Sequence, residues 1–201
     1  MTTFAVFDAA RDFMRIGVGR LKTQNYACLY IGDKGERLAH VAPHLFHADD
    51  AGSITHMALS GQQPDEAGIA FDADCEFGVL FRHFRRFLTV RRERDNEAVL
   101  FRYYDPRILR VFLPVCTREE LQQFFGPVTA FHCQGDDPGQ VLSFSVNKRG
   151  NLAEEQSKFD DFFVQRYGIR PESIEPFPAP VPPPPEKESV KRARRIMLRS
   201  R

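Results

Sequence analysis

Three histidines and two aspartates lie within eleven positions, a spacing that could bind a metal ion. The group is His40, His44, His47, Asp49 and Asp50. Imidazole and carboxylate groups are ligands of zinc and other divalent ions. Pro43, however, prevents the regular helix that would place His40 and His44 on one face, and in extended structure His44 and His47 point to opposite faces. We therefore expect no metal site and no cofactor, although a metal-dependent enzyme remains one alternative.

Sequence signatures of a catalytic site are missing from the chain. It has no GxSxG elbow, P-loop, HExxH or cysteine-based signature. Its cysteines, Cys28, Cys75, Cys116 and Cys133, are far apart and include no CxxC pair, which argues against a zinc ribbon and a dense disulfide framework. A catalytic triad can still form from residues distant in sequence. We expect no catalytic residues and a protein that is not an enzyme.

The segment RYYDPR, residues 102 to 107, places two arginines around one aspartate. Asp105 followed by Pro106 predicts a helix start, because a carboxylate accepts orphan backbone N–H groups and proline loses no bond at the first helical position. Asp105 could also take a bidentate bond from an arginine. Alternatively, Arg102 or Arg107 could project from this junction and bind an acidic group on a partner. The sequence leaves both interpretations open.

A run of arginines follows in the middle of the chain and could bind nucleic-acid phosphates. Its members are Arg82, Arg85, Arg86, Arg91, Arg92 and Arg94. Helical spacing places the first three opposite an apolar stripe, which is typical of a solvated helix face. A nucleic-acid-binding module that uses the stretch from Arg82 to Arg94 and the basic C-terminal tail is the alternative function, but we do not expect nucleic acid as the partner.

The first part of the chain predicts short alternating elements. We expect a strand at 4–7, a helix capped by Asp8 that runs to residue 21, a strand at 26–31 that ends in a turn at 32–35, and an extended segment at 38–46 interrupted by Pro43. A short helix at 54–59 and a strand at 68–71 follow. Apolar residues at three- and four-residue steps predict an amphipathic helix over 76–88.

The second part predicts a hairpin, three helices and two strands. The hairpin pairs 88–90 with 98–104, and the helix that Asp105 caps follows it. Thr117 and Glu120 form a capping box for a helix at 118–125, which Gly126 and Pro127 end. Strands at 128–133 and 141–146 precede a last helix at 152–167. The predicted fold is mixed α+β: a sheet with amphipathic helices packed on it, a short C-terminal helix and a disordered tail.

Five segments resemble the family labelled domain of unknown function 4123, whose members are type VI secretion effector adaptors. They are, in the order of that family, FAVFDAA at 4–10, VAPHL at 41–45, HFRRFLTV at 83–90, VLFRYYDPRIL at 99–109 and FFGPV at 124–128. Ala9 stands where the family commonly has glycine. The resemblance implies a chaperone-like adaptor that binds one cognate toxic effector and helps to load it on a VgrG-type spike protein.

Composition and the resemblance divide the chain into three parts. Residues 1–133 are the expected adaptor core, 134–170 a hairpin and helix extension, and 171–201 a proline-rich linker and basic tail that we expect to be disordered. On the extension, unburied Phe159, Phe162 and Phe163 are candidate partner-binding residues, with Arg102 and Arg107 in the core. Asp8, Pro43, Asp105, Pro106, Gly126 and Pro127 are expected to be structural.

The charge and the apolar pattern favour a cytoplasmic protein without a membrane span. The 201 residues include 28 Lys and Arg and 27 Asp and Glu, so the chain has no bulk bias toward anionic partners. No run of about 18 apolar residues occurs, and the first residues lack the basic and apolar regions of a signal peptide. From Glu186 onward seven basic residues stand against two acidic ones, so that an acidic body carries a basic end.

Overall fold

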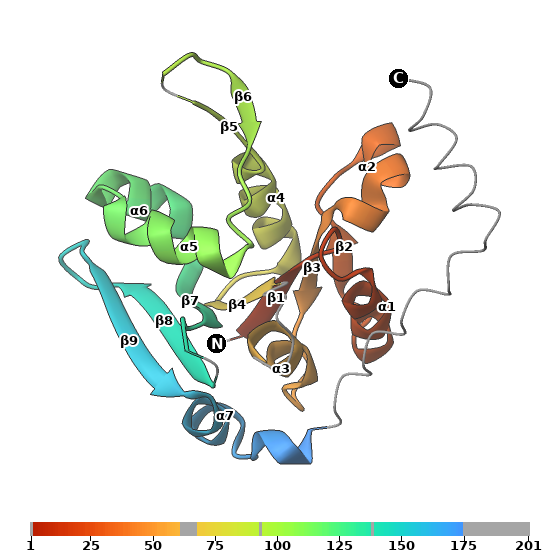
Figure 1. The fold of residues 1–201 in the computed structure, drawn as a ribbon, viewed down its shortest axis with the longest axis vertical. Helices are drawn as coiled ribbons and strands as arrows, with labels where there is room; N and C mark the ends of the chain where they lie inside the picture. The colour runs from red at the N-terminus through yellow and green to blue at the C-terminus, as the bar shows by residue number, and fades with distance from the viewer. Residues whose placement is uncertain (1, 61–67, 93, 138, 175–201) are drawn as a thin grey trace, which may run out of the picture.

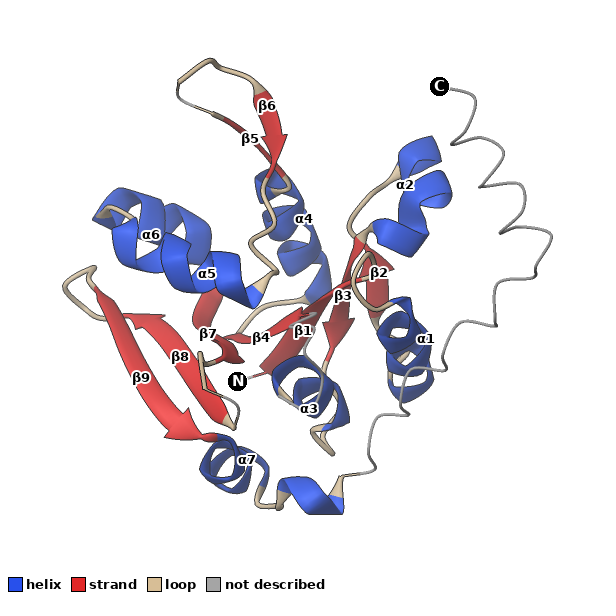
Figure 2. Cartoon of the chain, viewed as in Figure 1, coloured by secondary structure: helices blue, strands red, loops and turns tan. Residues whose placement is uncertain are grey.

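A seven-stranded antiparallel sheet forms the centre of the molecule, and helices cover both of its faces (Figures 1 and 2). The computed structural model describes residues 2–60, 68–92, 94–137 and 139–174. The strand order is β2-β3-β1-β4-β7-β8-β9, and β5 and β6 form a separate hairpin that projects beyond α4. The predicted mixed α+β class is confirmed.

The elements alternate along the chain as short strands and helices. The strands are β1 (Thr2–Asp8), β2 (Tyr26–Cys28), β3 (Pro43–His47), β4 (Gly68–Ala73), β5 (Thr89–Arg91), β6 (Ala98–Leu100), β7 (Val128–Gln134), β8 (Gln140–Val146) and β9 (Leu152–Lys158). The helices are α1 (Phe13–Lys22), α2 (Gly32–Leu38), α3 (Ser53–Leu59), α4 (Phe77–Phe87), α5 (Pro106–Phe112), α6 (Arg118–Phe125) and α7 (Phe159–Tyr167). Three 3-10 turns are η1 (Ala39–Val41), η2 (Leu113–Val115) and η3 (Pro171–Ser173).

Strand β1 shows how the sheet separates two apolar cores. Successive side chains of a strand point to opposite faces. Phe4 and Val6 therefore join the core under α4, α5 and α6, whereas Ala5 and Phe7 join the core under α1, α3 and α7. Because β1 is paired on both sides and covered on both faces, it is an apolar run without alternation.

The predicted signals at several helix ends are confirmed. Asp105 caps α5, whose first residue is Pro106, and Thr117 and Glu120 form the capping box of α6. Gly126 ends α6 with a positive φ of 48°, and Pro127 separates it from β7. The amphipathic helix expected at 76–88 is α4, which buries Leu80, His83 and Phe84.

The prediction that Asp8 caps α1 is wrong. Strand β1 continues through Asp8, which pairs with Pro43 of β3, and α1 begins only at Phe13. Its cap is Asp12, whose carboxylate accepts hydrogen bonds from the backbone N–H groups of Met14 and Arg15. Asp8 instead accepts a bond from the N–H of Ala10 at 3.0 Å, which shapes the turn before the helix.

Residues 32–46 also differ from expectation. Residues 32–35, expected to be a turn, form the start of α2, and η1 follows this helix directly. Pro43 begins β3 rather than interrupting an extended segment, and its carbonyl accepts the backbone N–H of Leu29 at 2.9 Å. At the hairpin, β6 stops at Leu100 instead of Tyr104, because Tyr103 and Tyr104 are buried in the turn that leads into α5.

The predicted helix at 152–167 is a strand in its first half. A turn brings Leu152–Lys158 back along β8, and the two strands pair over seven residues, from Val146 with Leu152 to Gln140 with Lys158. This ladder overrides the helix propensity of Ala153, Glu154 and Glu155. The last helix therefore begins at Phe159.

The C-terminal boundary lies slightly beyond the expected one. η3 and the buried Ile174 follow α7, so ordered contacts continue past residue 170. The division expected at residue 133 falls inside β7, and β8 and β9 extend the same sheet. The tail expected to be disordered covers residues 171–201; its first four residues are described, and the part from residue 175 onward lies outside the described residues.

Candidate functional site

The segment RYYDPR forms an ionic cluster where β1 ends and α5 begins. Asp8 and Asp105 are both buried, with 1% and 2% of their surface exposed. Arg102 donates a hydrogen bond to the carboxylate of Asp8, and its Nη2 lies 3.9 Å from Oδ2 of Asp105. Arg107 donates through Nε and Nη2 to the two oxygens of Asp105 at 3.0 and 2.7 Å. The segment thereby joins two elements 94 residues apart.

Two buried carboxylates share the cations of this cluster. Burial raises the pKa of Asp105, the positive charges of Arg11 and Arg102 lower it, and the nearby charge of Asp8 raises it again, so that the net pKa shift is upward. Nε of Arg11 lies 3.8 Å from the Asp105 carboxylate. The folded environment of Asp105 therefore favours the protonated carboxyl group more than water does.

The predicted cap and bidentate bond at Asp105 are present in the structure, whereas a contact of either arginine with a partner stays a prediction. Asp105 caps α5 by accepting the backbone N–H of Arg107 at 3.1 Å, and it also takes the predicted bidentate bond. The side chains of Arg102 and Arg107 keep 34% and 51% of their surface exposed. Their guanidinium groups thus bind aspartates of their own chain at the surface of the molecule.

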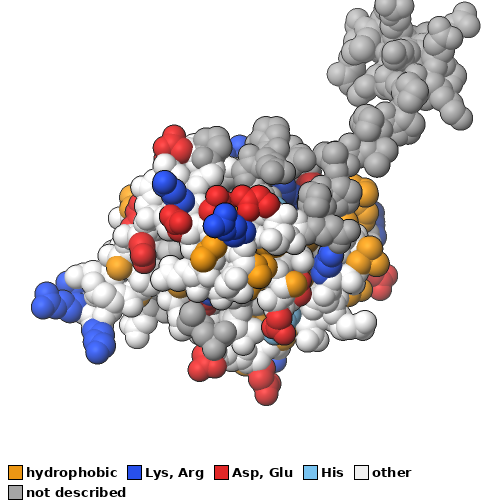
Figure 3. Space-filling model, turned by 90° about the horizontal axis from the view of Figure 1, so that it is seen from below, with side chains coloured by type: hydrophobic (Ala, Val, Ile, Leu, Met, Phe, Trp, Pro, Cys, Tyr) orange, Lys and Arg blue, Asp and Glu red, His pale blue; other side chains and the backbone are white. Residues whose placement is uncertain are grey.

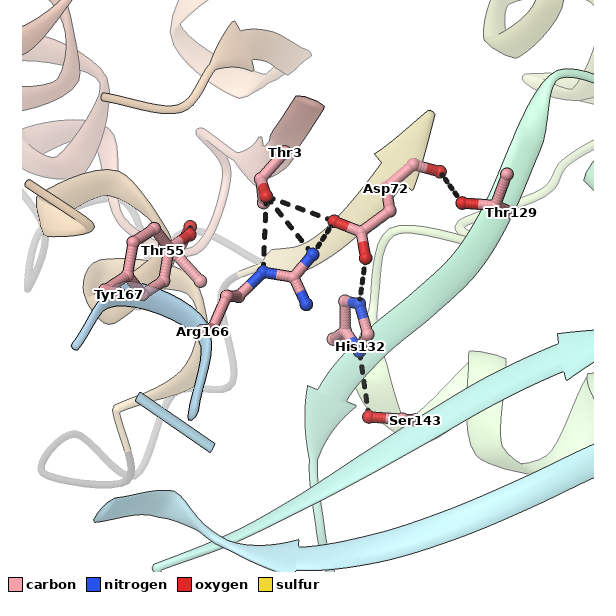
Figure 4. A network of polar contacts seen from close by, with 8 residues as sticks. All are labelled: Thr3, Thr55, Asp72, Thr129, His132, Ser143, Arg166 and Tyr167. Atoms are coloured by element: carbon pink, nitrogen blue, oxygen red, sulfur yellow. Dashed lines mark hydrogen bonds and ion pairs between the residues drawn. The ribbon is translucent and has the colours of Figure 1, made fainter. Parts of the chain in front are cut away.

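A second polar network lies on the opposite face of the sheet, beneath α7 (Figure 4). In the register of β4, β7 and β8, Ala70 lies opposite His132 and His132 opposite Ser143. Asp72 stands two residues further along β4 and so reaches His132 diagonally. Residues from four separate elements meet in this way, because Arg166 of α7 joins them from above the sheet.

Hydrogen bonds connect this network from β1 to β8. Nε2 of His132 lies 3.0 Å from the Asp72 carboxylate, and Nδ1 lies 2.8 Å from Oγ of Ser143. Arg166 donates to the other oxygen of Asp72 and, at 3.3 Å, to Oγ1 of Thr3. Thr3 itself donates to Asp72 at 3.1 Å. The Asp72 carboxylate, 1% exposed, is thus bonded to three side chains.

The electrostatics indicate an ionised aspartate and a neutral histidine. Burial raises the pKa of Asp72, but the hydrogen bonds from His132 and Arg166 and the positive charge of Arg166 lower it by more, so that the net pKa lies below the ordinary value. Burial also lowers the pKa of His132, and the attraction of Asp72 only partly reverses this shift. A neutral His132 donates its Nε2–H to Asp72 and accepts the Ser143 hydroxyl at Nδ1.

Ser143, His132 and Asp72 have the composition and order of a catalytic triad, but their surroundings favour a structural role. Ser143 stands in the middle of β8 and is paired with His132 on one side and Glu155 on the other. Acyl transfer needs N–H donors directed at the developing oxyanion, and the N–H groups of a strand paired on both sides serve its ladders. The carboxylate that would orient the imidazole is also bonded to Arg166.

An open hollow of about 1040 Å³ lies beside this network, between α7, β9 and the start of β1. Polar and acidic side chains line much of it, among them Asp49, Asp50, Glu154, Glu155, Ser143 and Arg166. Figure 3 views the molecule from the α7 side and shows acidic side chains spread over this face, with Lys and Arg side chains at its left end. In the described part of the chain, no three His, Cys, Asp or Glu side chains are placed to bind a metal ion.

The three phenylalanines expected to bind a partner lie against the protein's own core. Phe162 and Phe163 are 7% and 0% exposed, and Phe159 is partly buried. The ring of Phe162 contacts His132, and that of Phe163 contacts His56 of α3. The expectation of unburied rings is wrong, because the apolar side of α7 covers the sheet and α3. These rings stabilise the fold and offer little surface to a partner.

Two of the histidines and Arg92 of the arginine run also have partners within the chain. His44 and His47 point to opposite faces of β3, as predicted: His44 is buried and Nε2 lies 2.8 Å from the carbonyl of Ala39, while the ring of His47 contacts Phe4. Arg92 binds the carboxylates of Asp95 and Glu97 at 2.5 and 2.8 Å. This acidic pairing reduces the positive field of the Arg82 to Arg94 stretch.

No linear pattern in the sequence predicts the Asp72 network. Asp72 and Arg166 are 94 residues apart, and Asp72 and His132 are 60 apart. Asp72 follows the apolar run from Gly68, where it resembles the polar end of a strand. If Asp72 had been assigned to the interior of a strand paired on both sides, it would have indicated a buried partner, because carboxylates are rarely buried without one.

Comparison with known proteins gives one match. The family model described as Domain of unknown function (DUF4123) matches residues 3–123, from β1 into α6. Neither a curated protein nor a solved structure matches the chain. The RYYDPR cluster lies inside the matched region, whereas β7, β8, β9 and α7 lie beyond it.

Proposed function

The chain belongs to the family described as Domain of unknown function (DUF4123), and from this membership we propose that it is an adaptor, or chaperone, of type VI secretion. It binds one cognate toxic effector and helps to load it on a VgrG-type spike protein. The family match over residues 3–123 carries this proposal, because four of the five segments that resemble type VI effector adaptors lie within that range and the fifth begins directly after it.

The distribution of exposed apolar side chains supports a protein-binding function. Among the residues that the structure describes, seven of the twelve large exposed apolar side chains fall within residues 13–41, which run from α1 to η1 at the β2 end of the sheet (Figure 1). These seven are Phe13, Met14, Leu21, Tyr26, Ile31, Leu38 and Val41. Apolar side chains concentrated on one part of a surface are typical of a site that another protein covers.

The proposed adaptor is not an enzyme and needs no cofactor. The Ser143–His132–Asp72 array is proposed to fasten α7 to the sheet. Burial raises the pKa of Cys28, Cys75 and Cys116, to about 11 for Cys116, and this shift disfavours nucleophilic thiolates. Catalysis would then belong to the effector that the adaptor carries.

The proposed location is the cytoplasm, where an effector would be loaded before its secretion. No helix of the described residues is long and apolar enough to cross a membrane. All four cysteines are free thiols, as expected of a reducing compartment.

Co-purification tests the proposal. The tagged chain is expressed with the effector and spike proteins encoded beside it, and each complex is sized by chromatography with mass determination. A complex of defined stoichiometry with one neighbouring effector is the expected result. If the chain elutes alone in the presence of every neighbouring candidate, the adaptor proposal fails.

A further inference from the structure

The outer face of α1 is apolar although helices that face solvent are usually polar. Phe13, Met14 and Leu21 expose 52%, 47% and 85% of their surface. At 100° per residue, Phe13, Gly17 and Leu21 stand one above the other on successive turns, and Met14 lies beside Leu21. We call these four residues and Arg20 the α1 face. The opposite side of α1 buries Arg15, Ile16 and Gly19.

Gly17, at the centre of this face, is not required by packing against any of the residues that the structure describes. A side chain at Gly19 would meet the ring of Phe46 at 2.8 Å, so packing accounts for that glycine. A side chain at Gly17 would meet nothing within 4 Å, and its φ is not positive. Glycine destabilises a helix relative to alanine, and one of its few compensating uses is the close approach of another backbone. Gly17 therefore leaves room for another backbone to pack closely against α1.

The charge of α1 limits what can pack there. The helix contains Arg15, Arg20 and Lys22 and no acidic residue. Arg15 is buried and binds Asp12 at 3.1 Å, whereas Arg20 lies on the exposed side with its guanidinium 4.8 Å from the centre of the Tyr26 ring. Basic charge thus borders the apolar stripe at the C-terminal end of α1. Acidic groups on the facing surface would complement it.

We propose that the α1 face binds an amphipathic helix of the effector, with apolar residues toward Phe13, Met14 and Leu21 and acidic residues beside Arg20. This inference rests on the proposed adaptor function and names the docking surface and the chemistry of its partner. A helix suits the site because a glycine at the centre of a packed helix lets the two axes approach to the lower end of the usual 8–10 Å. The anchors of such an interface are the apolar side chains at its centre.

The test compares two α1 variants with a matched control in the co-purification experiment. Leu21→Asp places a charge on the apolar stripe. Gly17→Leu fills the open approach and replaces glycine with a good helix former, so it should leave the helix intact. The control is Val115→Asp in η2, because Val115 is also strongly exposed, at 76%, and lies on another part of the molecule. Far-ultraviolet circular dichroism and thermal unfolding verify that each variant folds.

Both α1 variants should weaken effector binding by about tenfold or more, the effect of losing an interface anchor, and the control by less than about twofold. A photo-reactive benzophenone amino acid at position 21 should cross-link to the effector, and mass spectrometry should place the cross-link on an acidic amphipathic helix. Effector binding that both folded α1 variants retain overturns the docking surface while the adaptor function stands. A cross-link to a basic or extended segment overturns the proposed partner chemistry.

Two further outcomes separate this inference from the function on which it rests. A wild-type chain that captures no neighbouring effector removes the proposed function and the docking surface together. A wild-type chain that instead forms a dimer, which Leu21→Asp dissolves, shows that a second copy covers the α1 face and overturns the effector helix.

Discussion

Asp72 and Asp105 are equally buried, at 1% and 2% exposed, yet their surroundings shift their pKa values in opposite directions. Asp72 is bonded to His132, Arg166 and Thr3, and its pKa falls below the ordinary value. Asp105 binds Arg107, but burial raises its pKa, and the nearby charge of Asp8 adds to this rise, so that the net pKa shift is upward.

The comparison shows that burial alone does not determine what a carboxylate contributes to stability. An ionised group under α7 has its hydrogen-bonding capacity satisfied by donors from three elements, and it ties the C-terminal helix to the part of the sheet that the family model matches. At the start of α5, by contrast, the carboxylates of Asp8 and Asp105 both lie close to the same guanidinium group, that of Arg102. Asp72 therefore stabilises the fold as an anion, whereas Asp105 acts chiefly as a helix cap.

Removing the Asp72 carboxylate should have the largest effect. In Asp72→Ala, His132 and Arg166 lose their common partner, and breaking a buried pair costs about 3–5 kcal/mol. We expect a value of about 3 kcal/mol, because the Arg166 side chain is 19% exposed and can regain some water. Urea unfolding measures the loss, with the exposed Asp74→Ala as control. Equal stability of the two variants would show that the network does not fasten α7.

Replacing Asp105 should have an intermediate effect that depends on the substitute. Asp105→Ala removes the cap of α5 and should cost about 1–2 kcal/mol. Asp105→Asn keeps a capping oxygen and relieves the repulsion from Asp8, so that its stability at pH 7 should lie within about 0.5 kcal/mol of the wild type. The same urea unfolding experiment compares the two. An asparagine variant as unstable as the alanine variant would mean that the ionic bond to Arg107 matters more than the cap.

The pH dependence of the two asparagine variants should have opposite signs. A folded-state pKa below the unfolded value of 3.8 makes Asp72 stabilising above that pH, and this contribution is lost as pH falls through the folded pKa. For Asp105 the folded pKa is raised, so its contribution is present below pH 3.8 and is lost as pH rises through the folded pKa. Relative to wild type, Asp72→Asn should therefore lose less stability at pH 3 than at pH 7, and Asp105→Asn should gain between pH 4 and pH 7. Unfolding at several pH values measures both differences; parallel curves for both variants would contradict the opposite pKa shifts.

The helix cap and the arginine bond at Asp105 were predictable from the sequence because their determinants are local, whereas the bond from Arg102 to Asp8 joins residues 94 positions apart. Asp105, Pro106 and Arg107 are consecutive, and the capping box of α6 spans four residues. The Asp72 network depends on the register of β4, β7 and β8 and on the docking of α7, none of which a linear pattern contains. For the same reason β9 was expected to be helical: its residues favour a helix locally, and only the pairing with β8 makes them a strand.

Surface predictions failed for a related reason. The spacing of Phe159, Phe162 and Phe163 indicated an apolar side of a helix, and α7 has one, but spacing does not reveal whether that side faces the chain's own sheet or a partner. The structure assigns it to the sheet. On α1 the difference between Gly17 and Gly19 is equally invisible in the sequence, because only the position of Phe46 separates a glycine required by packing from one that is not.

The smallest expected loss of stability comes from replacing the arginine that binds each aspartate, Arg107 for Asp105 and Arg166 for Asp72. Arg107→Ala removes a guanidinium that is 51% exposed and should cost less than about 1 kcal/mol, since solvent screens an exposed ion pair and the cap at Asp105 survives. Arg166→Ala removes a better buried cation and leaves Asp72 with His132 and Thr3, so its cost should exceed that of Arg107→Ala by about 1 kcal/mol or more. Urea unfolding of both variants at low and high salt supplies the measurement, because screening should reduce the Arg107 contribution more than that of Arg166. Equal costs with equal salt dependence would mean that the different exposure of Arg107 and Arg166 does not make their ion pairs different in strength.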